Sequence, residues 1–194
     1  MELEFMSEAT QPKYEDDYRL VAKNGKNWYL NLIEEIKEPI TLLPLIKALS
    51  VASVTDTVYL RINSGGGQVD TAISILSAIH GCAARVIAIC DSAASAATLI
   101  TLACDEVWLY PYTEFMIHSI TSGTYGTTKD NKKLLLHQED YHRDIMIVAY
   151  KGFMDEKEVV ELIDNADTIW LYGKDLEDRF TEWAKINNKT VRIN

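Results

Sequence analysis

The sequence predicts an α/β domain whose strands pair largely in parallel, and two observations carry this prediction. Segments rich in β-forming apolar residues alternate along the chain with segments whose apolar residues recur at helical spacing. This β–α–β–α–β order is typical of a sheet with helices packed against it. In addition, 194 residues with 47% hydrophobic content fit one ordinary domain with a sizeable core.

The first half of the chain supplies the predicted sheet and its helices. Five apolar segments have strand character: Trp28–Leu32, Thr57–Asn63, Arg85–Cys90, Glu106–Tyr110 and Glu114–His118. Helical spacing is found over Ile40–Val54 and again from Val69 to His80, where Gly81 ends the pattern. A small-residue segment, Ala93–Ala103, follows the third strand. We therefore expect helices to connect successive parallel strands.

The second half begins with a Ser/Thr-rich loop after His118 and continues as a long charged helix over about residues 129–151. Shorter helices are expected over Asp155–Asp164 and Lys174–Lys185. The long helix carries more apolar residues than an isolated solvated helix would, namely Leu134, Leu135, Tyr141, Ile145, Val148 and Ala149. This pattern predicts that part of the helix meets a partner surface.

The acidic N-terminus differs from the rest of the chain. Residues 1–17 are polar and lack periodicity, which predicts a mobile arm, whereas residues 18–194 are expected to form a single domain. The arm has no basic region followed by an apolar run, and no stretch approaches 18 uninterrupted apolar residues. We therefore expect a cytoplasmic protein that does not bind membranes.

Charge and metal-binding residue types exclude further classes of function. With 29 acidic against 19 basic residues, the formal charge of −10 would repel nucleic acids and anionic lipids. Cys82, Cys90 and Cys104 are odd in number and form no CxxC pair, which favours free thiols in a reducing compartment. His137 and His142 lack the spacing of a zinc-binding HExxH helix. No nucleic acid, metal or other cofactor is expected.

Three consecutive glycines, Gly65–Gly67, lie between a predicted strand and a predicted helix. Backbone N–H groups there can approach an anion without a Cβ in the way. A Walker A loop would need Gly-Lys-Ser/Thr where Gln68 and Val69 stand, and a dinucleotide fingerprint would need a third spaced glycine where Asp70 stands. Both phosphate-binding interpretations therefore fail, and a plain tight turn and an oxyanion-binding turn remain open.

Ser95 and His118 are candidates for a nucleophile and a base. Ser95 lies where an apolar strand passes into a small-residue helix, whose positive dipole end favours negative charge nearby. His118 ends an apolar strand, and active-site groups in open α/β sheets gather at strand ends. Each residue also has a simpler interpretation, because a serine at a helix start is usually an N-cap and a histidine here can be a buried structural residue.

Taken together, three motifs resemble the Clp protease proteolytic subunit family in their order and spacing. They are Ile62-Asn63-Ser64-Gly65-Gly66-Gly67, Ala93-Ala94-Ser95 and Met116-Ile117-His118. The resemblance covers about residues 20–185 and includes the long helix, which is similar to that family's ring-to-ring handle. It implies an α/β, crotonase-like (Clp protease) fold with repeated β-β-α units and a protruding handle helix over about residues 129–151.

The resemblance also implies catalytic roles. Ser95 would be the nucleophile, His118 the base, and Asp167, which precedes an aromatic-apolar segment after the handle, the acid. Asp164 is the alternative acid. A serine protease further needs two N–H groups for the oxyanion, and those of Gly67 and Ala96 are the candidates.

Several positions depart from the family's pattern. The family's usual proline in the first motif is Gly65 here, its glycine before the serine motif is Asp91, and its methionine after the nucleophile is Ala96. Ser119 and Ile120 stand in place of Gln-Pro. These departures predict a divergent member, either phage-encoded or of plastid type.

The activity implied is that of a serine endopeptidase, the proteolytic subunit of an ATP-dependent Clp-type protease. It would cleave unfolded polypeptides through an acyl-enzyme, with an AAA+ unfoldase as partner, and would assemble with further copies into stacked rings, a double heptamer. The compartment would be a host cytoplasm or a plastid stroma. Two rival hypotheses are a catalytically silent ring-forming subunit and a crotonase-type acyl-CoA hydratase or isomerase.

Overall fold

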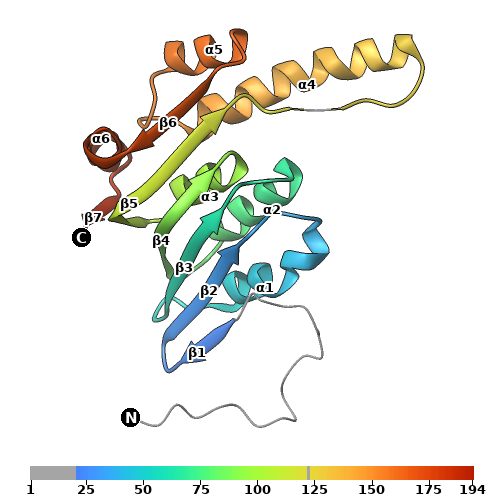
Figure 1. The fold of residues 1–194 in the computed structure, drawn as a ribbon. Coiled ribbons are helices and arrows are strands. Elements are labelled where there is room, and N and C mark those ends of the chain that lie inside the picture. The colour runs from blue at the N-terminus through green and yellow to red at the C-terminus, as the bar shows by residue number, and fades with distance from the viewer. Residues whose placement is uncertain (1–20, 122) are drawn as a thin grey trace.

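One seven-stranded mixed sheet organises the chain in this computed structural model, which describes residues 21–121 and 123–194 (Figure 1). The predicted mobile arm, residues 1–17, lies outside the described residues. The strands are β1 (Ala22–Asn24), β2 (Asn27–Ile33), β3 (Thr57–Ser64), β4 (Arg85–Ala94), β5 (Glu106–His118), β6 (Thr168–Tyr172) and β7 (Thr190–Ile193). Their order is β1-β2-β3-β4-β5-β6, and β7 also pairs with β5.

The pairing is parallel from β2 through β5 and between β5 and β7, and antiparallel only for β1 with β2 and β5 with β6 among the described strands. The predicted α/β class with largely parallel pairing is therefore confirmed. The short strands β1 and β7 were not predicted, because three or four residues are too few to show a period.

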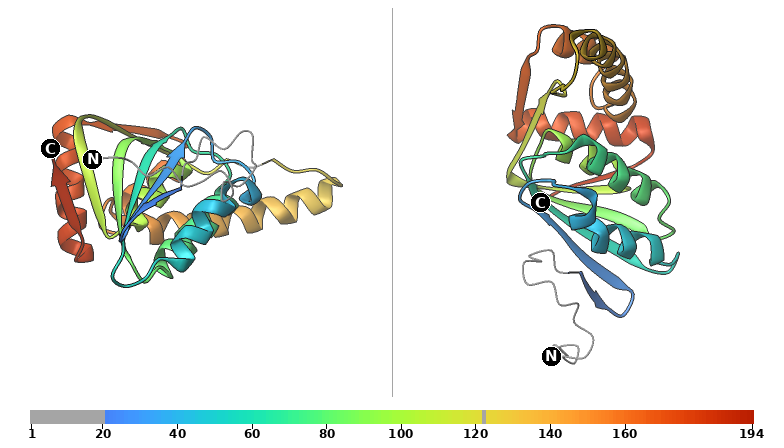
Figure 2. Two further views of the ribbon diagram at one scale, coloured as in Figure 1. Left: turned by 90° about the horizontal axis from the view of Figure 1, so that it is seen from below. Right: turned by 90° about the vertical axis from the view of Figure 1, so that its right-hand side faces the viewer.

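Helices cover the sheet and continue beyond it. After the 3-10 helix η2 (Pro39–Leu42), they are α1 (Leu43–Val51), α2 (Val69–His80), α3 (Ala96–Ala103), α4 (Thr128–Ala149), α5 (Glu156–Asp164) and α6 (Gly173–Asn187). Figure 2 shows α2 and α3 lying side by side along one face of the sheet. Every residue of α3 is buried, so this short helix sits at the centre of the core beneath β3, β4 and β5. No helix within the described residues has the length and apolar character needed to cross a bilayer.

The two strands predicted on either side of Pro111 form one strand, β5, with a local excursion. Cys90 of β4 pairs with Leu109, but two residues later Ser92 pairs with Glu114, so residues 110–113 loop out of register. The hydroxyl of Thr113 accepts a hydrogen bond from the Tyr110 N–H and donates one to the Cys90 carbonyl. The expectation of two separate strands was wrong, because these bonds keep the strand direction across the proline.

An aromatic cluster holds the end of β5 against the C-terminal helices. Phe115 of β5 contacts Phe153 and Phe180, with ring centroids 5.3 Å apart in both cases, and Phe180 in turn contacts Trp183 at 5.4 Å. Phe115, Phe180 and Trp183 are almost fully buried. Since His118 lies three residues after Phe115, this cluster fixes the strand end that carries it.

Helix α4 projects away from the sheet, as Figure 1 shows. Its exposed apolar side chains include Leu134, Leu135, Leu136, Tyr141 and Val148. Two residues assigned to this apolar side from the sequence, Ile145 and Ala149, are instead half-buried and pack against the core. The projecting part of α4 therefore carries the exposed apolar surface, and the part near residue 149 belongs to the domain.

Candidate active site

Ser95 occupies a strained turn between β4 and α3. Its φ of 54° and ψ of −127° are unusual for a residue with a side chain, and such a conformation costs on the order of 1–3 kcal/mol. The turn is held from β5, because the Ser95 N–H donates to the Met116 carbonyl at 2.8 Å. Ser95 is the residue before α3, but its hydroxyl makes no capping hydrogen bond. Ser95 is therefore the N-cap residue of α3 by position, but its hydroxyl does not cap the helix.

The hydroxyl of Ser95 meets His118. The Ser95 Oγ lies 2.9 Å from the His118 Nε2, and both side chains are half-buried. The parallel register explains the approach, because Ala94 pairs with Met116 and both chains then reach the same edge of the sheet. A half-buried histidine bonded to a serine hydroxyl can accept that hydroxyl's proton, whereas a fully enclosed structural histidine could not exchange protons with a substrate.

The glycine turn lies directly against Ser95. A Cβ on Gly66 would come within 2.7 Å of the Ser95 Cβ and 3.0 Å of the Ala96 nitrogen. A Cβ on Gly67 would lie 2.2 Å from the Ile36 carbonyl oxygen. Both glycines also have positive φ values, 90° and 144°. Close approach and conformation both require glycine at these two positions, whereas Gly65 has open space around it.

Two backbone N–H groups remain available beside Ser95. The loop after β2 pairs with the turn through the bonds Ile36 N–H to Gly66 carbonyl and Gln68 N–H to Ile36 carbonyl, which leaves the Gly67 N–H without an acceptor among the described residues. The N–H of Ala96, the first residue of α3, likewise has no acceptor in that part of the chain. This arrangement fits an oxyanion-binding turn better than a plain tight turn.

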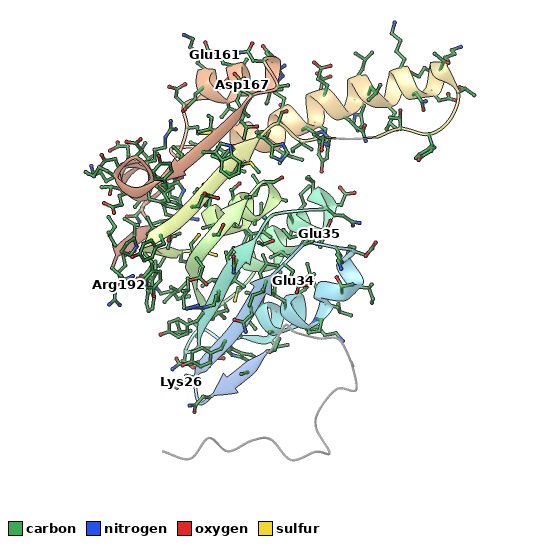
Figure 3. The ribbon with its side chains drawn as sticks, viewed as in Figure 1. Lys26, Glu34, Glu35, Glu161, Asp167 and Arg192 are labelled. Atoms are coloured by element: carbon green, nitrogen blue, oxygen red, sulfur yellow. The ribbon has the colours of Figure 1, made fainter. Side chains whose placement is uncertain are left out.

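Neither candidate acid is bonded to His118. Asp167 lies just before β6 and is exposed (Figure 3), and Thr168, the next residue, is the one paired with His118. The Asp164 carboxylate instead accepts a hydrogen bond from Arg143 of α4 at 2.7 Å. Among residues 21–121 and 123–194, no carboxylate forms a hydrogen bond with the His118 ring. The assignment of the acid to Asp167, with Asp164 as the alternative, stays a prediction.

The cysteines and the histidines of α4 are poorly placed to act as nucleophiles or metal ligands. Burial raises the pKa of the Cys90 thiol to about 12 and raises that of Cys104 further, so neither forms a thiolate readily. The described residues contain no cluster of three His, Cys, Asp or Glu side chains that could hold a metal ion. His137 is exposed, as the sequence indicates, but His142 is half-buried and burial lowers its pKa. The expectation that both are solvated is therefore wrong for His142.

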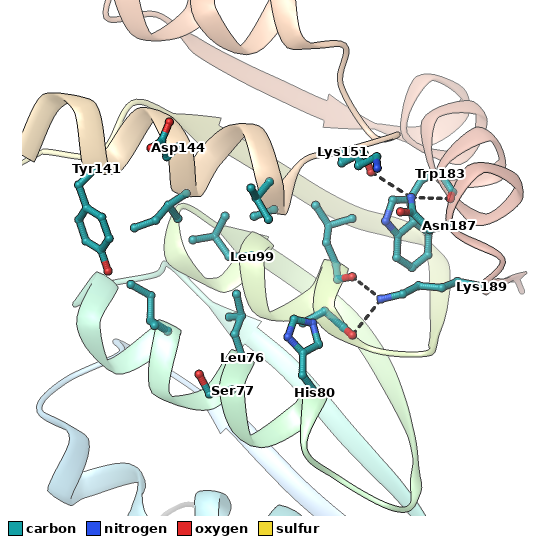
Figure 4. Close-up of a pocket in the computed structure, with 16 residues that line it drawn as sticks. Leu76, Ser77, His80, Leu99, Tyr141, Asp144, Lys151, Trp183, Asn187 and Lys189 are labelled. Atoms are coloured by element: carbon teal, nitrogen blue, oxygen red, sulfur yellow. Dashed lines mark hydrogen bonds between the residues drawn. The ribbon is translucent and has the colours of Figure 1, made fainter.

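A groove of about 640 Å³ lies between α2, α3, α4 and α6, away from Ser95 (Figure 4). Leu76, Leu99 and Tyr141 are among the residues that line it, and none of the predicted site residues does. The Lys189 ammonium at its edge donates to two carbonyls at the end of α3, both at 2.9 Å. The groove thus has an apolar wall and a lysine already bound to backbone, and Ser77 and His80, which also line it, are not hydrogen-bonded to each other.

Sequence reasoning missed the hydrogen bonds that hold the glycine turn, Gly65–Gly67, in place. The Ser64 hydroxyl accepts a hydrogen bond from the Gly66 N–H and donates one to the Glu34 carbonyl. The backbone of Ile36 then pairs with the turn on its other side. These contacts join segments about 30 residues apart, and no local pattern in the sequence signals them. The contact between the Thr98 and Tyr150 hydroxyl groups was missed for the same reason, since these residues are 52 positions apart.

Comparison with known protein families agrees with this geometry. The family model described as Clp protease matches residues 13–165, which is most of the chain. No curated protein matches the sequence. The seven-stranded sheet and the helices described above are consistent with the crotonase-like fold expected for that family. The chain therefore belongs to the Clp protease family, whose members are in general serine peptidases.

Proposed function

We propose that this chain is an active serine endopeptidase that cleaves unfolded polypeptides, with Ser95 as nucleophile and His118 as general base. The observation that carries the proposal is the 2.9 Å contact between the Ser95 Oγ and the His118 Nε2 at the strand-to-helix turn. Such a pair is what nucleophilic catalysis by a hydroxyl requires, because serine is a weak nucleophile until a base accepts its proton.

The reaction follows from the placement of the groups. His118 takes the Ser95 proton as the hydroxyl oxygen attacks the peptide carbonyl carbon, and the resulting oxyanion is bound by the N–H groups of Gly67 and Ala96. Each such donor contributes about 3 kcal/mol in well-studied hydrolases. His118 then gives the proton to the departing amine, which leaves an acyl-enzyme on Ser95. Water, deprotonated by His118, attacks the acyl carbon. His118 then returns this proton to the Ser95 oxygen as the acyl bond breaks, which releases the second product and restores the serine.

The acid that orients His118 is proposed to be Asp167. Its exposed carboxylate is unpaired among the described residues, whereas that of Asp164 is engaged by Arg143. Asp167 also adjoins Thr168, the residue opposite His118 on β6. We propose that assembly with further copies brings the Asp167 carboxylate to the His118 ring.

Assembly and partners are part of the same proposal. The exposed leucines on the projecting part of α4 support a contact with a second copy, in stacked rings of seven, because a soluble monomer rarely leaves such a stripe uncovered. Family membership supports an AAA+ unfoldase as the partner that delivers unfolded chains. Free cysteines support a reducing compartment, which we propose is a host cytoplasm or a plastid stroma.

The test is hydrolysis of a protein that has been reduced and alkylated and is therefore unfolded. Cleavage is measured as the release of new amino groups. Wild type and Ser92→Ala should cleave it, and Ser95→Ala should not. Ser92 is a suitable control because it lies on β4, three residues before Ser95, and is also half-buried. Cleavage by Ser95→Ala at the wild-type rate would contradict the proposal.

The rival hypotheses predict different results in the same preparation. A silent ring-forming subunit would form large particles but release no amines. An acyl-CoA hydratase would instead remove the ultraviolet absorbance of an enoyl-CoA. The Ser95–His118 contact favours the peptidase, because crotonase chemistry generally works through carboxylates and needs no serine nucleophile.

A further inference from the structure

We infer that a buried pair of hydroxyl groups, on Thr98 and Tyr150, aims the Ala96 N–H at the oxyanion by fixing the Ser95 carbonyl. This inference rests on the proposed function, since it assigns positioning residues to the same site. Thr98 lies one turn into α3, and Tyr150 directly follows the last residue of α4. Neither residue is part of the motifs that carry the family resemblance.

The hydrogen bonds form a chain with a defined direction. The Thr98 Oγ1 lies 2.6 Å from the Ser95 carbonyl oxygen and 2.5 Å from the Tyr150 hydroxyl. A carbonyl can only accept, so Thr98 gives its one proton to Ser95, and Tyr150 must then donate to Thr98. The Thr98 N–H also donates to the Ser95 carbonyl, at 2.9 Å. This carbonyl therefore receives two hydrogen bonds from one residue.

Fixing this carbonyl fixes the Ala96 N–H as well. The Ser95 C=O and the Ala96 N–H belong to one planar trans peptide unit, so they point in opposite directions. Rotation of that unit would turn the N–H away from the attacked carbonyl while leaving the Ser95 hydroxyl in place. Because the Ser95 backbone is in a strained conformation, it would relax by such a rotation unless something held it. The two bonds from Thr98 resist that rotation.

Burial protects the hydrogen bonds of Thr98 and Tyr150 from water. Thr98 is fully buried and Tyr150 is 2% exposed, so water cannot replace either bond. Burial also raises the pKa of the Tyr150 hydroxyl, which keeps it protonated as a donor. A buried hydroxyl without a partner is destabilising, so each member of the pair favours the bonded arrangement of the other. Hydrogen bonds on the carbonyl further polarise the peptide and strengthen its N–H as a donor.

The experiment measures how fast a fluorophosphonate reacts with Ser95 as the reagent concentration is raised. Thr98→Val should lower the maximal rate by about tenfold to a hundredfold, somewhat less than the complete loss of an oxyanion donor. The reagent concentration at half-maximal rate should not change, because the N–H acts on charge that develops only during reaction. Thr98→Ser keeps the hydroxyl and should restore the rate. Tyr150→Phe keeps the ring and should show a smaller loss.

Thr101→Val is the matched control. Thr101 is equally buried, lies one turn further along α3, and donates its hydroxyl proton to the Ala97 carbonyl instead. Its loss should lower the thermal midpoint about as much as Thr98→Val but leave the labelling rate unchanged. If Thr98→Val folds poorly, Tyr150→Phe and Thr98→Ser still test the inference through the maximal rate.

Three results would overturn the inference. They are a wild-type maximal rate in Thr98→Val, an equal loss in Thr101→Val, and failure of Thr98→Ser to restore the rate. Failure of the proposed function looks different, because wild type would then not react, or Ser95→Ala would react equally well. If wild type is labelled and Thr98→Val is labelled at the same maximal rate, the positioning role of Thr98 is rejected while the proposed function stands.

Discussion

Ser95, at the turn between β4 and α3, lies 2.9 Å from His118 at the end of β5, and both residues pack on buried residues of the same chain. On the surface formed by α4, α5 and the start of β6, Asp164 and Asp167 are exposed, and neither is bonded to His118. The nucleophile and base are thus positioned by the core of one domain. The acid depends on a surface that also carries exposed leucines and that we expect to be covered by another copy.

This difference teaches which part of the site a single chain can build alone. Parallel register between β4 and β5 brings Ser95 to His118, and the buried core keeps that register. In the segment that joins α5 to β6, the Asp167 N–H is bonded to the Leu162 carbonyl at 3.0 Å, but the Asp167 carboxylate forms no hydrogen bond among the described residues. A site divided in this way would combine a stable nucleophile with an acid whose position responds to assembly. Four substitutions can break or sharpen the comparison.

The largest effect is expected from the base. His118→Ala should lower hydrolysis of an unfolded protein by about 10⁴-fold or more, because nucleophile and base act as a unit. His142→Ala is the control, since His142 lies on α4 and makes no contact with Ser95. A His118→Ala variant with nearly normal turnover and an unchanged thermal midpoint would contradict the role of His118 as the base that the core holds against Ser95.

The acid should have the next largest effect. Asp167→Asn keeps the size of the side chain but loses the charge that stabilises protonated His118, which should lower turnover by about 10³- to 10⁴-fold. Asp164→Asn and Arg143→Gln break only an exposed ion pair, which is worth about 0–1 kcal/mol, and should leave turnover nearly unchanged. The opposite pattern, with loss in Asp164→Asn and near-normal turnover in Asp167→Asn, would move the acid to Asp164.

The glycine turn should be sensitive at one position and tolerant at its neighbour. Gly66→Ala places a Cβ 2.6 Å from the Ala94 carbonyl oxygen and should lower turnover by about a hundredfold, since the turn must move. It should also destabilise the fold by about 1–3 kcal/mol because of the positive φ. Gly65→Ala meets nothing within 4 Å and should change neither quantity. Equal tolerance of both changes in kinetics and thermal unfolding would contradict the close approach.

The smallest effect on turnover is expected from the exposed surface of α4. The double variant Leu135→Glu, Leu136→Glu introduces charge where a second copy should pack, so light scattering should detect smaller particles. Peptidase activity should fall by several-fold, about 1 kcal/mol in barrier, and not by the full effect of Asp167→Asn, because the Asp167 carboxylate is still present and can reach His118 part of the time. Val54→Glu, at a more exposed apolar residue outside α4, is the control. An unchanged large particle in the double variant, or a monomeric wild type, would refute the handle assignment.

Much of the fold followed from the sequence because its elements have strong local patterns. The helix after Gly67 and its end at Gly81 match α2, and the strand over residues 57–63 is extended by one residue in β3. Each of these rests on a period or a breaker that lies within about a dozen residues. His118 was singled out because it ends a strand, and its pairing with Ser95 was implied by the resemblance to the Clp protease family.

The rest could not be predicted because it depends on distant contacts. β6 has only five residues, and its pairing with β5 joins segments about 50 residues apart. The bond from Tyr150 to Thr98 joins residues 52 positions apart and requires knowledge of how α4 ends against α3. The position of the acid is the extreme case, because neither carboxylate is held in place by the core of this chain.

The most direct test of the central claim is to find the residue on which a fluorophosphonate reacts in the wild-type protein. Digestion and mass spectrometry should locate the added mass on the peptide that contains Ser95, and His118→Ala should suppress that product. The added mass on another residue, equal labelling without His118, or no labelling of folded wild type would contradict an activated serine at this turn.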